Sequence, residues 1–163
     1  MKNIYLIGMP GSGKTTVAKH IAKMLDISLA DMDKMIVEAQ GVTINEIFAQ
    51  KGEEYFRDLE TQTLKQLCCV TDTVVATGGG VIKREQNRQL LKQGTVVFID
   101  VHPDTIAKRS KFSDRPLLKD NLDNFKKLYN ERYELYKNAA NIIVSGEGTP
   151  VDVAVRILTF IKR

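Results

Sequence analysis

Residues 8–15 read Gly-Met-Pro-Gly-Ser-Gly-Lys-Thr and stand between an apolar run of strand length, residues 4–7, and a segment of helical periodicity. A glycine-rich loop between a strand and a helix lets successive backbone N–H groups point at an anion. The lysine of such a loop reaches the β- and γ-phosphates of a nucleotide, and the hydroxyl residue after it serves Mg²⁺. The segment therefore predicts a strand–loop–helix unit that binds a nucleoside triphosphate. The alternative is a glycine-rich turn that caps an ordinary helix, which the Gly-Lys-Thr ending disfavours. The predicted nucleotide-binding residues of this loop are Gly11, Ser12, Gly13, Lys14, Thr15 and Thr16.

The length of the chain limits how its substrates can be held. With 163 residues, of which 43% are hydrophobic, the chain fits a single domain, 1–163, with one core, so this domain must hold both substrates. The net charge of +4 is only mildly basic, and a protein that binds a negatively charged triphosphate has its own reason to be basic. The charge therefore does not imply that the protein binds nucleic acid. We see neither an apolar run of membrane-spanning length nor a signal peptide, so we expect a cytoplasmic protein that does not bind a membrane. We also expect a monomer that does not bind nucleic acid.

Short apolar segments alternate with helical segments along the chain. This alternation is typical of the α/β class, in which a parallel sheet is covered by helices on both faces in three α/β/α layers. Helix starts are marked by Thr43 with Glu46, a capping box, and by Thr149 followed by Pro150. The predicted strands cover residues 4–7, 28–30, 73–76, 96–99 and 141–144, with helices in the intervening segments.

Two carboxylates follow the second predicted strand, in Asp31-Met32-Asp33. If this segment is extended, both carboxylates project to the side of the phosphate loop, so one can serve a metal ion and the other a substrate hydroxyl. The Met32 side chain should then point away from both. The alternative is that the two acids stand at the N-terminus of the following helix, where they interact with its dipole.

Three consecutive glycines, residues 78–80, follow Thr77 at the end of the third predicted strand. Without side chains, this tract lets a substrate lie against the backbone and hydrogen-bond to it. A flexible turn between a strand and a helix is the alternative.

Arg57 precedes Glu60 by three residues in the helical segment 53–67, so the two side chains share a helix face. As a surface ion pair they would contribute about 0.2–0.5 kcal/mol. If Arg57 faces a pocket, Glu60 would instead orient the guanidinium for a substrate carboxylate. Further along the chain, Arg132 stands among three tyrosines whose spacing indicates a buried aromatic stripe, namely Tyr129, Tyr133 and Tyr136.

The segment 112–122 is the one long irregular piece of the chain, and we predict that it forms a mobile lid. Five cations lie in or beside it: Lys108, Arg109, Lys111, Arg115 and Lys119. They could form a solvated face or an RNA-binding patch. A clamp on a transferring phosphate fits better, because aromatic residues are scarce here and two aspartates dilute the charge.

Taken together, these motifs resemble the shikimate kinase family, part of the nucleoside-monophosphate-kinase-like group of phosphate-loop kinases. The resemblance covers nearly the whole chain. It rests on the phosphate loop, Asp31-Met32-Asp33, the block 52–60, Thr77-Gly78-Gly79-Gly80, Arg115-Pro116-Leu117-Leu118, and Arg132-Tyr133-Glu134-Leu135-Tyr136. One departure is Met32, where the family more often has a small or polar residue.

The resemblance implies phosphorylation of the 3-hydroxyl of shikimate by ATP, giving shikimate 3-phosphate and ADP on the route to chorismate and the aromatic amino acids. It implies a lid near 112–122, a substrate-binding helical region near 33–60, and Mg²⁺ near Thr15 and Asp31. Shikimate would be held by Asp33, Arg57, Gly79 and Arg132, with the two arginines on its carboxylate. The catalytic residues would be Lys14, Asp33 and Arg115, the last closing over the phosphates from the lid, and adenine would lie near Arg109 and Pro150. The alternatives are a kinase of gluconate or another small metabolite, and an ATP-binding regulator with weak catalysis.

Overall fold

The computed structural model describes residues 1–110 and 122–161. Five strands form one sheet in the order β2-β3-β1-β4-β5, and all neighbouring strands pair in parallel. The strands are β1 (Ile4–Ile7), β2 (Ser28–Asp31), β3 (Thr73–Ala76), β4 (Thr95–Asp100) and β5 (Ile142–Ser145). The five predicted strands are confirmed, with ends that differ by at most one residue.

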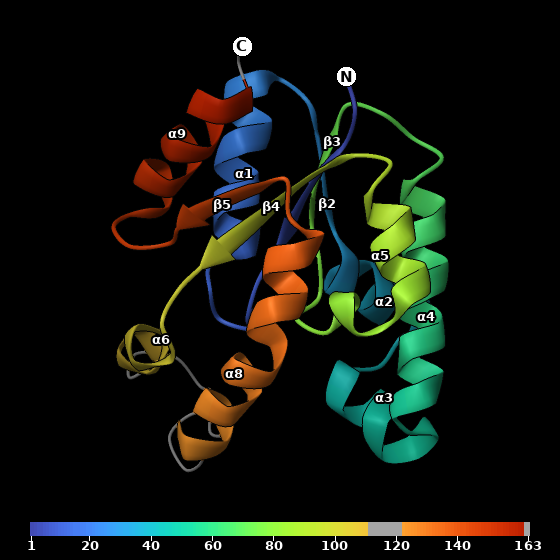
Figure 1. Ribbon diagram of the computed structural model, residues 1–163. Helices are drawn as coiled ribbons and strands as arrows, with labels where there is room; N and C mark the ends of the chain where they lie inside the picture. The colour runs from blue at the N-terminus through green and yellow to red at the C-terminus, as the bar shows by residue number, and fades with distance from the viewer. Residues whose placement is uncertain (111–121, 162–163) are drawn as a thin grey trace.

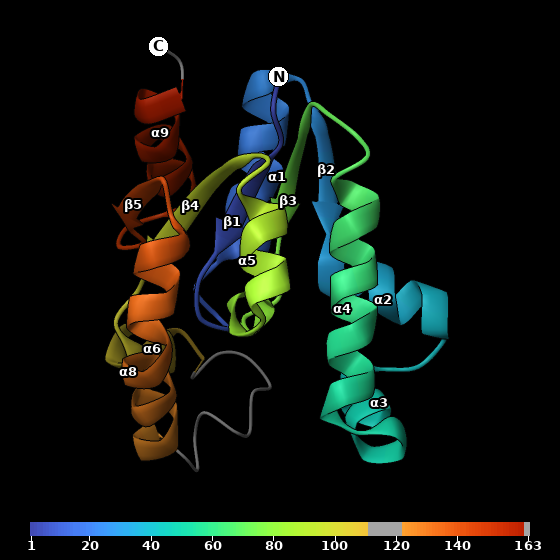
Figure 2. The ribbon, with the colours of Figure 1, turned by 45° about the vertical axis from the view of Figure 1, so that its right-hand side comes forward.

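Helices cover both faces of this sheet, which confirms the three-layer α/β/α class. In Figures 1 and 2, α1 and α9 lie together on one face, and α4, α5 and α8 cover the other. The helical elements are α1 (Lys14–Leu25), α2 (Met32–Gln40), α3 (Ile44–Lys51), α4 (Glu53–Leu67), η1 (Val81–Lys83), α5 (Glu85–Leu91), α6 (Pro103–Ser110), α8 (Leu122–Ala139) and α9 (Pro150–Ile161). Within the described residues, no helix combines the length and apolar character needed to span a membrane.

Side-chain caps fix two of the helix starts. The Thr43 hydroxyl accepts a hydrogen bond from the Glu46 amide, 3.1 Å away, at the start of α3. Thr149 and Asp152 exchange two such bonds at the start of α9, of 3.0 and 3.1 Å. Both predicted helix starts are confirmed, since each cap satisfies amides that have no partner inside the helix.

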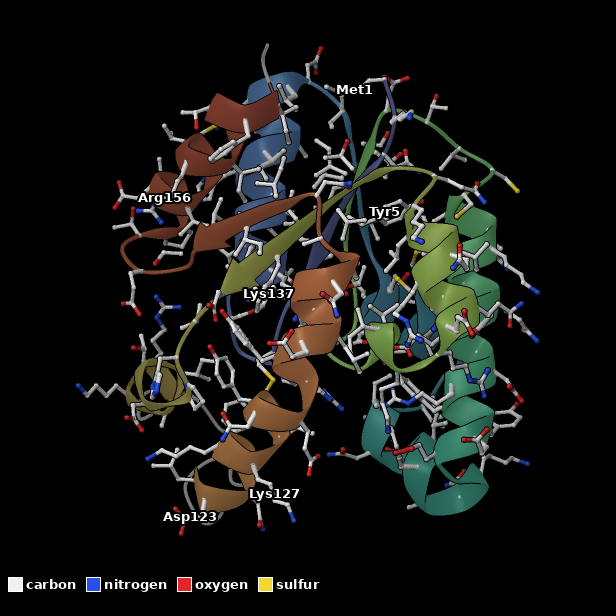
Figure 3. The ribbon with its side chains drawn as sticks, viewed as in Figure 1. Met1, Tyr5, Asp123, Lys127, Lys137 and Arg156 are labelled. Carbon is white, nitrogen blue, oxygen red and sulfur yellow. The ribbon has the colours of Figure 1, made fainter. Side chains whose placement is uncertain are left out.

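The main core is built on the sheet, where β1 and β3 are buried at every position. Figure 3 shows Tyr5 inside this core, whereas Asp123 and Lys127 lie in the first turns of α8, away from the sheet. A smaller satellite core lies between α2, α3 and α4, around Ile36, Ile47 and Phe56. Helices α2 and α4 contribute to both cores.

The strands are parallel, so their carboxyl ends lie at the same edge of the sheet. At this edge β1 is followed by the phosphate loop. The predicted lid falls almost entirely outside the described residues, which resume at Leu122, the first residue of α8.

Candidate active site

The phosphate loop curls onto the N-terminus of α1 through glycines in the left-handed region, among them Gly11 (φ +82°) and Gly13 (φ +93°). Lys14 is buried, and its ammonium donates to the carbonyls of Gly8, at 2.7 Å, and Met9, at 2.9 Å. The loop thus holds its own lysine in place. A bound phosphate would offer this ammonium a charged partner in place of neutral carbonyls.

A pocket of about 610 Å³ opens beside this loop. Its wall consists of the loop, the start of α2 and the end of β3 with the glycine tract: Pro10, Gly11, Gly13, Lys14, Thr15, Thr16, Asp31, Asp33, Lys34, Val37, Thr77 and Gly79. The volume is in the range of small-molecule sites. Most predicted loop residues therefore line one cavity, while Ser12 is buried and its hydroxyl has no hydrogen-bond partner in the part of the chain that the structure describes.

The segment Asp31-Met32-Asp33 is not extended, so that premise of the sequence interpretation is wrong. Strand β2 ends at Asp31, which caps α2 by accepting a hydrogen bond from the Lys34 amide at 3.2 Å. Asp33 then lies in the first turn of α2, and Met32 is buried in the main core. Both carboxylates still line the pocket. They therefore stand at a helix N-terminus, as the alternative stated, and both also line the pocket.

The two carboxylates differ in their surroundings. The second oxygen of Asp31 accepts the Thr15 hydroxyl at 3.0 Å, which places two oxygen ligands side by side on the wall of the pocket. Burial raises the pKa of Asp33 above its ordinary value, and Asp31 adds to this rise, while Lys14 and Arg57 act against it. Asp33 is therefore a stronger proton acceptor than an exposed aspartate.

Each glycine of the tract is required by a close neighbour. A Cβ at Gly78 would lie 2.7 Å from the Glu60 Oε2 atom, and one at Gly79 would lie 2.7 Å from the Pro10 Cδ atom. A Cβ at Gly80 would collide with the guanidinium of Arg57. The tract forms a turn between β3 and η1, and it is also a packing junction at which side chains of other elements approach the glycines closely.

Arg57 and Glu60 form a buried ion pair, with 3.0 Å between Nη1 and Oε1 and side-chain exposures of 9% and 1%. The surface-pair alternative is therefore wrong. Burial raises the pKa of Glu60, and Arg57 opposes the rise. The Arg57 Nε and Glu60 Oε2 atoms have no hydrogen-bond partner among the described residues. Buried polar atoms are rarely left unpaired. The Glu60 Oε2 atom and the guanidinium of Arg57 lie beside the glycine tract.

Helix α8 brings the predicted aromatic stripe to the same junction. Tyr136 is fully buried, whereas Tyr129 and Tyr133 are half-buried, so the core prediction holds completely for one tyrosine of three. The Tyr136 hydroxyl donates to the carbonyl oxygen of Gly79. Arg132, one turn earlier, contributes its charge to the surroundings of both Tyr136 and Glu60.

The two residues predicted near adenine lie at the other side of the site. Arg109, in the last turn of α6, donates to the carbonyl of Gly146 at 2.7 Å. Gly146 begins the loop that leads to Pro150, the first residue of α9. Arg109 is thus held against the loop that precedes Pro150, but neither residue lines the 610 Å³ pocket. Arg115 lies outside the described residues.

Four residues of the pocket wall were not among the predicted site residues: Pro10, Lys34, Val37 and Thr77. Val37 lies four residues after Asp33 on α2, so the helical period would have found it once α2 was known to begin at Met32. The role of Tyr136 left no local signal, because its partner Gly79 is 57 positions away.

The chain is similar to known proteins over nearly its full length. A family model described as shikimate kinase matches residues 10–162. A shikimate kinase of Sulfurihydrogenibium sp. (strain YO3AOP1) is 44% identical over 165 residues, covering 100% of this chain and 99% of the relative. One of Clostridium botulinum (strain Eklund 17B / Type B) is 46% identical over 157 residues, covering 95% and 94%.

The fold comparison points the same way. The structure of a shikimate kinase from Acinetobacter baumannii in complex with shikimate superposes with a TM-score of 0.92 at 37% identity, covering 99% of this chain and 93% of the other. Residues 10–15 of the phosphate loop, the buried ion pair and the glycine tract lie within the matched span of the family model. This chain belongs to the shikimate kinase family.

Proposed function

We propose that the chain transfers the γ-phosphoryl group of ATP to the 3-hydroxyl of shikimate, giving shikimate 3-phosphate and ADP. This step leads toward chorismate and the aromatic amino acids. The observation that carries the proposal is a single pocket that joins the phosphate loop to Asp33 and Gly79. Membership of the family, and the shikimate complex of the Acinetobacter baumannii relative, support shikimate as the acceptor.

The phosphate loop would hold the triphosphate, with Lys14 on the β- and γ-phosphates. Arg109 and Pro150 are our candidates for adenine contacts, and Arg115 is the candidate for a second cation on the phosphates. The adjacent oxygens of Thr15 and Asp31 suit Mg²⁺, which prefers oxygen ligands and substrate phosphates. When bound, this ion would neutralise charge on the phosphates.

Asp33 would accept the hydrogen bond of the attacking hydroxyl and help to remove its proton. Its raised pKa supports this role, since a base works best when its pKa approaches the working pH. The proton transfer adds little in a loose transition state, so positioning carries most of the rate. Arg57 and Arg132 would bind the shikimate carboxylate.

Arg57 suits this task because Glu60 already fixes its guanidinium. One N–H group, at Nη1, is engaged by Glu60, and the buried Nε atom has no partner among the described residues. A carboxylate ligand would supply the missing acceptor and a compensating charge. Glu60 would therefore orient the arginine without touching the substrate carboxylate.

The test is ADP release in a coupled assay with Mg²⁺ and ATP, with shikimate or gluconate as acceptor. We expect the wild type to release ADP with shikimate but not with gluconate, and we expect no turnover in a folded Lys14→Ala variant. Turnover with gluconate, or ATP hydrolysis independent of any acceptor, would overturn the proposal.

The carboxylate grip is tested by Arg57→Lys, which replaces a planar fork by a point charge. We expect the KM for shikimate to rise by at least about tenfold and the KM for ATP to change little. Arg84→Lys is the matched control, because Arg84 is also paired with acids of α4 but is partly exposed. Equal effects of both variants on shikimate would show that Arg57 does not bind the carboxylate.

A further inference from the structure

The Tyr136 side chain joins three segments that are distant in the sequence. Its ring is fully buried and stacks on Phe98 of β4, with 5.0 Å between ring centroids. Its hydroxyl donates to the carbonyl of Gly79, at 2.5 Å, and lies 3.8 Å from the sulfur of Met9 in the phosphate loop. One hydroxyl on α8 therefore contacts the glycine tract and the phosphate loop together.

Gly79 has little freedom at this point. Its Cα lies so close to the Pro10 ring that a Cβ would be 2.7 Å from Cδ and 2.8 Å from Cγ. A trans peptide is planar, so the bond to the Gly79 carbonyl also fixes the direction of the following N–H group. The backbone that lines the pocket at Gly79 is thus held by Pro10 and by Tyr136.

The Tyr136 hydroxyl keeps its proton at neutral pH. Burial is the main cause that raises the pKa of Tyr136, to about 12, and Glu60 adds to it, while Arg132 and Arg57 act against it. A neutral phenol can donate to a carbonyl oxygen throughout the range in which a kinase works. Arg132 lies one turn earlier on the same helix, so anchoring Tyr136 also anchors that arginine.

We propose that Tyr136 is a positioning residue for the acceptor side of the pocket. Its hydroxyl holds the Gly79 backbone in place between Pro10 and α8, and this contact sets the position of Arg132 relative to the glycine tract. The inference rests on the proposed function, because it assigns the acceptor to this side of the pocket. On the ATP side, built on α1 and the phosphate loop, the hydrogen bonds of Lys14 to the Gly8 and Met9 carbonyls do not involve Tyr136.

The test compares Tyr136→Phe with Tyr129→Phe. Tyr129 is a matched control, because it lies on the same helix and its hydroxyl donates to Asp100 at 2.8 Å, outside the glycine tract. For Tyr136→Phe we expect the KM for shikimate to rise about five- to tenfold, as for the loss of one hydrogen bond, and the KM for ATP to change less than about twofold. Tyr129→Phe should leave both unchanged.

A second measurement does not depend on the acceptor. Amide hydrogen exchange of residues 78–81 in the ligand-free protein should become faster in Tyr136→Phe and stay unchanged in Tyr129→Phe. The inference is wrong if Tyr136→Phe alters neither the exchange nor the KM for shikimate, or if it raises the KM values for shikimate and ATP equally. In either case, shikimate turnover by the wild type would still support the proposed function. If the exchange becomes faster but the wild type phosphorylates no shikimate, the positioning contact stands and the proposed function fails.

Discussion

Replacing Glu60 by leucine should cost this protein far more stability than the loss of an ordinary ion pair. The variant leaves the Arg57 guanidinium, 9% exposed, without its carboxylate partner at 3.0 Å. Removing one member of a buried pair costs about 3–5 kcal/mol, because an uncompensated charge remains inside the protein. An exposed pair contributes at most about 1 kcal/mol. At roughly 2–4 °C per kcal/mol for a chain of this size, Tm should fall by about 6–20 °C.

The assay is urea unfolding of the ligand-free protein, with Asp58→Leu as the matched control. Asp58 also lies on α4 and is paired with an arginine, Arg84, at 2.9 Å, but it is 62% exposed. We expect the control to lose less than about 1 kcal/mol. The double variant Arg57→Met with Glu60→Leu should regain most of the lost stability, since it removes both charges. Equal losses for Glu60→Leu and Asp58→Leu would refute the assignment of a buried, energetically coupled pair.

Two further predictions follow from the pocket wall. Gly79→Ala should cost about 1–3 kcal/mol by overpacking against the Pro10 ring, as measured by urea unfolding; an unchanged midpoint would show that this contact is loose. Burial raises the pKa of Asp33 in the folded state, so this carboxyl contributes to stability below the ordinary aspartate pKa of about 3.9. The wild type loses this contribution as the pH rises through the pKa of the folded state. Asp33→Asn escapes this loss, and its ligand-free stability relative to the wild type should increase across that pH window while turnover falls. Urea midpoints of both proteins between about pH 3.5 and 7 measure this, and a difference that does not change with pH would contradict it.

Local patterns were sufficient for most of the architecture. The apolar runs locate the central strands because burial on both faces leaves few polar positions, as in β1 and β3. The edge strands β2 and β5 are partly exposed. The limits of α4, residues 53 and 67, coincide with the predicted helical segment, and the Thr43 and Thr149 caps mark helix starts through bonds within three residues.

The candidate site was predictable only where its residues act locally. The start of α2 was missed because Asp31 ends a strand and caps a helix at the same time, so two local signals compete at one residue. The glycine tract was recognised, but its physical reason depends on Arg57 and Pro10, which tertiary folding brings to it. The burial of the Arg57–Glu60 pair likewise depends on the helices and strand ends around α4, which spacing along one helix cannot reveal.

The satellite core should give the two substrate sides of the proposed active site different resistance to heat. The Arg57–Glu60 pair lies on α4 between Phe56, in the satellite core, and Leu64, in the main core. Regions with few apolar contacts open at lower free energy than the centre of a domain. As the temperature rises, α3 and the first turns of α4 should open while the sheet and the phosphate loop are still folded. Warming should therefore abolish recognition of the acceptor before the protein loses its hold on the nucleotide.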